Sequence, residues 1–134
     1  MQRINYSSGA PLEEQTGYSR MVKLGNQIYI AGTTAVQPDG EVFGVTAYEQ
    51  AKYILVKSMA MLQRAGAEAK DVYKVKIYAI DMGSTKEIVA AYSEIFKEVR
   101  PVLTVVGTSQ LNRPTQLVEI ELEAMLDCEI QVEK

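Results

Sequence analysis

Three carboxylates alternate with apolar residues near the end of the chain, in the stretch VEIELEA at 118–124. Side chains alternate between the two faces of an extended strand, so Glu119, Glu121 and Glu123 share one face. A carboxylate in a partly apolar setting can position a water or accept a proton. A row of solvated or salt-bridged acids has the same pattern, and spacing alone does not single out one of the three.

Two earlier residues could complete a cleft with such an acid. Tyr18 begins a β-rich run and could offer its hydroxyl, and Gly32 ends that run, where the backbone could approach a ligand closely. Ordinary packing and a simple strand end are the alternatives. Arg100 and Arg113 lie next to loops, and either could bind a carboxylate or remain solvated.

The residues that are scarce exclude several classes of site. The chain has no histidine and one cysteine, Cys128, which removes histidine-based triads, histidine-based ribonucleases and the usual zinc sets. We therefore expect no metal and no cofactor. A net charge of −3 without a basic stripe argues against a nucleic-acid partner. The polar N-terminus and the lack of a long apolar run predict a cytoplasmic protein with no membrane contact.

The hydrophobic pattern predicts the elements that must position these residues. A hairpin over 18–32 turns at Gly25-Asn26, and a helix begins at a capping box of Thr46 and Glu49 and ends near Gly66. A strand over 71–81 follows, in which Tyr73, Val75, Ile77 and Ala79 are expected on one face. A second capping box, Ser84 with Glu87, starts another helix over 84–99. Two strands, 102–108 and 116–126, close the chain.

This order predicts a single α+β domain over 1–134. Two helices can cover only one face of a six-stranded mixed sheet. The other face would expose apolar residues unless another copy of the chain packs on it. We therefore expect a ring-forming homo-oligomer with clefts between its subunits. Leu103 and Val105 raise a question here, because a strand lining such a cleft would offer no polar group to a substrate.

Several segments together resemble the Rid/YjgF family of reactive-intermediate deaminases: GYSRMVKLGNQIYIAGTTAVQPDGEV, LQRAGAEAKDVYKVKIYAIDM, AAYSEIF and LVEIELEA. The resemblance runs from about Tyr18 to Ala124, and it rests on the order and spacing of the segments. It implies a chorismate-mutase-like fold and a homotrimer whose sheets form a central barrel. It also implies a small-molecule ligand in the intersubunit clefts, with hydrolysis of imines and enamines that needs no metal or cofactor.

The resemblance also assigns residues. It places the family's tyrosine, contributed by a neighbouring subunit, at Tyr18, the cleft glycine at Gly32, and the water-positioning glutamate at Glu119. The family's substrate-gripping arginine falls on Leu103, so the chain is similar to a branch of the family that lacks it. Thr104, Val105 and Arg100 are the other candidates around that position, and Arg100 could replace the missing cation from the cleft mouth.

Three functions remain open at this point. The first is hydrolytic deamination of an imine, an enamine or a related intermediate, with an uncharged or less acidic substrate because of Leu103. The second is a non-enzymatic module that binds a small molecule or has a regulatory role. The third, RNA cleavage, is disfavoured by the lack of histidine and by the negative charge.

Overall fold

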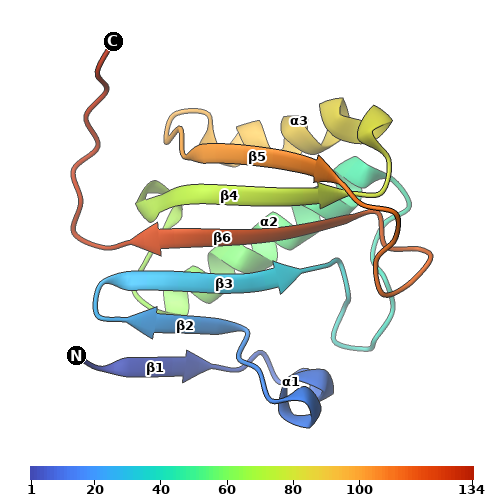
Figure 1. Ribbon diagram of the computed structural model, residues 1–134, viewed down its shortest axis with the longest axis horizontal. Coiled ribbons are helices and arrows are strands. Elements are labelled where there is room, and N and C mark those ends of the chain that lie inside the picture. The colour runs from blue at the N-terminus through green and yellow to red at the C-terminus, as the bar shows by residue number, and fades with distance from the viewer.

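Six strands form one mixed sheet in the computed structural model, which describes residues 1–134 (Figure 1). Their order across the sheet is β1-β2-β3-β6-β4-β5. All neighbouring strands are antiparallel except β4 and β5, which are parallel. The strands are β1 (Arg3–Tyr6), β2 (Met21–Leu24), β3 (Gln27–Thr33), β4 (Val72–Ala79), β5 (Val102–Gly107) and β6 (Val118–Met125).

The two long helices, α2 (Ala47–Arg64) and α3 (Thr85–Phe96), lie side by side on one face of the sheet (Figure 1). The predicted α+β architecture is therefore confirmed. A short helix, α1 (Pro11–Thr16), and two single-turn 3-10 segments, η1 (Ala69–Asp71) and η2 (Met82–Ser84), were not expected. No helix combines the length and the apolar composition that crossing a membrane requires.

Helix α2 begins where the sequence predicts. Thr46 is its N-cap: its side chain accepts a hydrogen bond from the Glu49 backbone N–H, and the Glu49 carboxylate accepts one from the Thr46 N–H in return. Its buried side packs on the sheet and consists of Ala47, Gln50, Ala51, Ile54, Leu55, Ser58, Met61 and Leu62. Gln50 ties the helix to the start of β6 by accepting a 2.9 Å hydrogen bond from the Leu117 backbone N–H.

The second predicted capping box, at Ser84, is wrong. Ser84 has φ −89° and ψ 4° and makes no side-chain capping bond, because the turn η2 precedes α3 directly. An N-cap side chain reaches its helix from an extended backbone conformation, which Ser84 does not have. Thr85 instead donates its hydroxyl to the Met82 carbonyl at 2.6 Å.

The pairing of β4 with β6 separates the core from the uncovered face of the sheet, which we call the open face. Ile77 pairs with Ile120 toward the helices, while Tyr78 pairs with Glu119 on the open face. Tyr73 also belongs to the open face, contrary to the expected alternation. The register shifts between Val72 and Lys74, so Val72 takes the buried position and Tyr73 turns outward.

Strand β5 is the edge strand next to β4. Val75 pairs with Leu103 and Ile77 with Val105, so Leu103 and Val105 point toward the helices, and Val105 packs on the core. The alternate residues Val102, Thr104 and Val106 lie on the open face.

Candidate functional site

A bulge in the middle of the sheet shapes the site. Ile30 of β3 pairs with Leu122 of β6, but the next pair along is Thr33 with Ile120. Ala31 and Gly32 therefore both stand opposite the single residue Glu121. Bulges of this kind bend a strand and redirect its side chains, and they occur often beside functional sites.

Gly32 leaves room for the Glu119 carboxylate. A Cβ atom built on Gly32 would lie 2.5 Å from Glu119 Oε2 and 3.1 Å from Glu119 Cδ. Any side chain at this position would collide with the carboxylate. The sequence suggested that Gly32 lets the backbone approach a ligand; in the structure its lack of a side chain accommodates Glu119.

The three alternating carboxylates of β6 differ in their partners, which spacing could not reveal. Glu123 accepts a 3.0 Å hydrogen bond from the Tyr73 hydroxyl and pairs with Lys74 at 3.5 Å. Glu121 accepts a 2.6 Å hydrogen bond from the Tyr78 hydroxyl. No group of the protomer donates a hydrogen bond to Glu119, although it is partly buried. Its acceptor sites are therefore available to a water or a ligand.

The surroundings of Glu119 favour its protonated form. Burial raises the pKa of this carboxyl above its ordinary value, and the negative charge of Glu121 raises it further. The positive charge of Arg20 opposes both effects without cancelling them. A glutamate with a raised pKa holds and releases a proton closer to neutral pH, which suits acid–base chemistry.

Removing the charge of Glu121 should lower the pKa of Glu119. In Glu121→Gln the neighbouring negative charge is gone, so ionisation of Glu119 becomes easier and its titration moves to lower pH. Carbon-13 NMR titration of the labelled glutamate carboxyls measures this directly. An unchanged or higher pKa for Glu119 would contradict the coupling, and Glu41→Gln, which alters an exposed loop acid, is the control.

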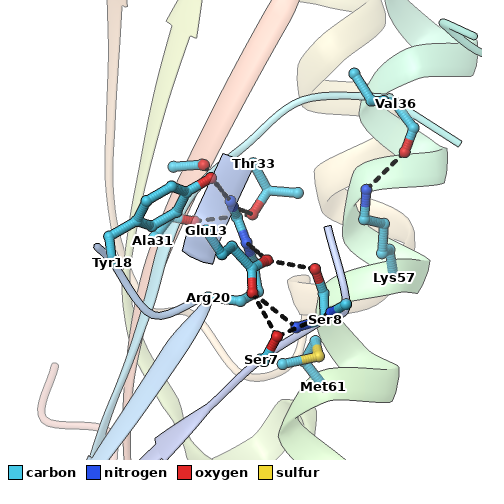
Figure 2. A network of polar contacts seen from close by, with 12 residues as sticks. Ser7, Ser8, Glu13, Tyr18, Arg20, Ala31, Thr33, Val36, Lys57 and Met61 are labelled. Atoms are coloured by element: carbon cyan, nitrogen blue, oxygen red, sulfur yellow. Dashed lines mark hydrogen bonds and ion pairs between the residues drawn. The ribbon is translucent and has the colours of Figure 1, made fainter. Parts of the chain in front are cut away.

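Beside this corner lies a polar network that the sequence did not suggest (Figure 2). The Glu13 side chain is 3% exposed and accepts hydrogen bonds from the Ser7 hydroxyl at 2.8 Å, the Ser8 backbone N–H at 3.0 Å and the Ser8 hydroxyl. Arg20, 12% exposed, pairs with it at 3.4 Å. Burial alone would raise the pKa of Glu13, but the Ser8 and Ser7 hydrogen bonds and the charge of Arg20 together lower it.

Arg20 links this network to the site. Its Nη1 atom donates to the Gly32 carbonyl at 2.7 Å and to the Thr33 hydroxyl at 3.0 Å, and its Nη2 atom donates to the Tyr18 hydroxyl at 2.7 Å. Arg20 thereby joins Tyr18 to Gly32 within one protomer. The expectation from the resemblance, that Tyr18 completes the cleft of a neighbouring subunit, concerns the assembly and stays a prediction. Sequence reasoning missed Arg20 because Glu13 and Arg20 meet only through the turn between α1 and β2.

The β5 candidates do not join Glu119 within one protomer. Leu103 and Val105 point toward the helix-covered face, and Thr104 lies on the open face next to Lys76. Arg100 lies two residues before β5 begins. Val102, the first residue of β5, pairs with Lys74 of β4. Lys74 lies four residues before Tyr78, which pairs with Glu119. At about 3.3 Å per residue this places Arg100 roughly 20 Å from Glu119.

Arg100 instead borders a separate hollow of about 220 Å³ at the far end of the sheet, together with Lys70, Tyr73 and Cys128. Arg100 is exposed there. No three histidine, cysteine, aspartate or glutamate residues gather where they could hold a metal ion. Arg20 connects the Tyr18 hydroxyl to the Gly32 carbonyl, and Glu119 lies against Gly32, so these four residues form a continuous cluster.

Comparisons with known proteins agree with this fold. The family model described as endoribonuclease L-PSP matches residues 9–126. A RutC family protein of Pyrococcus abyssi is 36% identical over 109 residues, which cover 81% of this chain and 84% of that protein. A mite protein, from Dermatophagoides farinae, named 2-iminobutanoate/2-iminopropanoate deaminase is 27% identical over 105 residues, covering 78% of this chain and 81% of that protein.

A solved structure shows the same architecture. The crystal structure of a member of the YjgF/YER057c/UK114 family from Mycobacterium tuberculosis superposes with a TM-score of 0.86 at 33% identity, covering 93% of this chain and all of that one. The chain thus belongs to the YjgF/Rid family, whose family model is described as endoribonuclease L-PSP.

Proposed function

We propose that this chain hydrolyses a small imine or enamine, releasing ammonia and a carbonyl compound, at the corner formed by Glu119, Gly32 and Tyr18. The observation that supports this best is the Glu119 carboxylate, which is partly buried, has no donor of its own and has a raised pKa. The name of the mite relative, an imine deaminase, points to the same chemistry.

The reaction needs one proton acceptor and one proton donor. Glu119 binds a water and accepts its proton as the oxygen bonds to the imine carbon, while the C=N π bond breaks and the imine nitrogen takes up a proton from solvent. The resulting carbinolamine then loses ammonia: the C–N bond breaks, the nitrogen receives the proton held by Glu119, and the hydroxyl proton returns to solvent to give the carbonyl. An enamine first becomes an imine by protonation at carbon.

The experiment offers the purified protein 2-iminopropanoate and 2-aminoacrylate, generated in situ, together with 2-aminoacrylamide, which lacks the carboxylate. The measurement is the rate at which each is lost compared with its spontaneous hydrolysis, with ammonia as a second readout. Acceleration of any of the three supports the proposal. Rates equal to the buffer control for all three would refute it.

A second candidate is a non-enzymatic module that binds a small metabolite. The observation that favours it is Leu103, because no arginine on β5 is present to grip a substrate carboxylate. A thermal-shift screen of metabolites followed by a turnover assay on each hit separates the two functions. A ligand that stabilises the protein and is recovered unchanged would favour the module.

We further propose that residues 1–134 form one domain that assembles as a homotrimer through the open face, with a cleft at each interface. Val102 on this face is 65% exposed, and Tyr29 and Tyr73 are also exposed there. Apolar side chains on an uncovered sheet face are stabilised when a second copy covers them. Edge strand β5 of one copy could then approach the Glu119 corner of the next.

A charge on the open face should break this assembly. Val102→Asp is expected to convert the trimer to monomers, because a buried unpaired carboxylate costs several kcal/mol. Light scattering coupled to size-exclusion chromatography measures the mass. The matched control is Val56→Asp on α2, where a valine of similar exposure, 54%, lies on a helix rather than on the sheet. A monomeric wild-type chain, or a Val102→Asp trimer, would contradict the proposal.

A further inference from the structure

Arg20 uses most of its hydrogen-bonding capacity within the protomer. A guanidinium has five N–H groups and no acceptor. Both N–H groups of Nη1 are engaged, by the Gly32 carbonyl and the Thr33 hydroxyl, and Nε faces Glu13. One N–H of Nη2 is donated to Tyr18. A single N–H remains, so Arg20 cannot grip a ligand carboxylate with two parallel hydrogen bonds.

The same contact fixes the role of the Tyr18 hydroxyl. Because Arg20 can only donate, the Tyr18 oxygen is the acceptor in their 2.7 Å hydrogen bond. The guanidinium also lies against the ring, 5.3 Å from its centroid, which restricts the side chain. The Tyr18 O–H hydrogen donates to no protein group. Tyr18 is exposed, at 36% of its residue surface, so its O–H group can donate to a ligand.

Glu119 supplies the complementary acceptor. Its carboxylate lies against Gly32 and receives no hydrogen bond from the protein. The Gly32 carbonyl accepts its hydrogen bond from Arg20. Glu121 adds negative charge next to it. The nearby lysines are engaged elsewhere: Lys57 donates to the Val36 carbonyl at 2.9 Å, and Lys76 lies over the Tyr78 ring. Within the protomer, a ligand carboxylate would therefore meet repulsion from Glu119 and Glu121 without a free cation to offset it.

We propose that Arg20 is a positioning residue that holds Tyr18 as a hydrogen-bond donor beside Glu119, so that the site selects an uncharged ligand with an acceptor atom next to an N–H group. Imines, amides and ureido groups have this pattern, whereas carboxylates lack the N–H. The inference rests on the proposed function and narrows its substrate class. Arg20 acts through Tyr18 and touches no reacting atom.

The test measures binding, so it does not depend on turnover. Pyruvamide and pyruvate differ only in the amide and carboxylate, and NMR titration of the full chain, observed at the Gly32 amide, gives a Kd for each. We expect pyruvamide to bind more tightly than pyruvate. Tyr18→Phe and Arg20→Lys should each weaken pyruvamide binding by about 2- to 10-fold, the value of one hydrogen bond. The double variant should be no weaker than the weaker single variant.

Arg64→Lys is the matched control, because Arg64 also lies over a tyrosine ring, that of Tyr6, and donates to the backbone at Ser7, but makes no contact with Gly32. Its pyruvamide Kd should be unchanged. Pyruvate binding as tightly as pyruvamide, no saturable pyruvamide binding, additive losses in the double variant, or an equal loss in Arg64→Lys would each overturn the proposal. If Arg20→Lys fails to fold, Tyr18→Phe, which removes only an exposed hydroxyl, still decides the donor role of Tyr18.

The outcome is separable from that of the proposed function. Pyruvamide cannot be hydrolysed as an imine, so its affinity reports recognition alone. Preference for pyruvamide without imine turnover would refute the hydrolase and keep the recognition. Imine turnover with preference for pyruvate would refute the recognition and keep the hydrolase.

Discussion

Glu119→Gln is expected to slow imine hydrolysis by about 10²- to 10⁴-fold, the usual contribution of a positioned general acid or base. Glutamine keeps the size and one carbonyl acceptor of the side chain but cannot take a proton from water. The fold should persist, because no group of the protein donates to Glu119. Thermal unfolding should even shift slightly upward at neutral pH, since a partly buried charge with a raised pKa is removed.

The matched control is Glu123→Gln on the same strand and the same face. Glu123 already has a tyrosine hydroxyl and a lysine as partners. The side-chain amide of the new glutamine can still accept a hydrogen bond from the Tyr73 hydroxyl. The rate of imine hydrolysis by Glu123→Gln should stay close to that of the wild type. Hydrolysis that survives Glu119→Gln, or that falls equally in Glu123→Gln, would remove Glu119 from the mechanism.

Gly32→Ala is expected to have the second-largest effect. The new methyl would lie 2.5 Å from Glu119 Oε2, closer than two non-bonded atoms can approach, so the carboxylate must move. Gly32 does not have a left-handed backbone conformation, and the collision alone is responsible. We expect a rate loss of about 10²-fold from the misplaced carboxylate, and a destabilisation of about 1–3 kcal/mol from overpacking.

The control for this substitution is Gly107→Ala on β5. A Cβ there would come within 3.1 Å of Met82 Cγ, in a flexible side chain that can move aside. Its rate and its stability in denaturant unfolding should stay near those of the wild type. A Gly32→Ala variant with wild-type kinetics would show that the Glu119 carboxylate can move away from residue 32 without loss of activity, which would contradict the prediction.

Local patterns were enough to predict most of the elements. The capping box at Thr46 and the alternation in β6 each depend on a few neighbouring residues, so the sequence predicted them correctly. The failures involved contacts that local patterns do not record. The 3-10 turn at Met82–Ser84 displaced the second capping box, and the bulge beside Val72 turned Tyr73 outward.

For the site, the sequence by itself determined which residue types are available: a tyrosine, a glycine, three alternating carboxylates, no histidine, and a leucine where the resemblance expects an arginine. It could not rank the three carboxylates, because they are equivalent by spacing. Only the tertiary structure distinguished them. Tyrosine hydroxyls of β4 donate hydrogen bonds to Glu121 and Glu123, whereas Glu119 lies against Gly32 at the bulge and receives no hydrogen bond.

The tertiary structure alone also brought Arg20 into the site. Its partners are Glu13 on α1, Tyr18 in the turn after α1 and Gly32 on β3, and only the pairing of β2 with β3 and the position of α1 bring them together. Side-chain periodicity records which face a residue occupies, whereas a hydrogen-bond network depends on distances between segments. The sequence therefore determined the chemistry available to this protein, and the folded sheet decided which groups are free to use it.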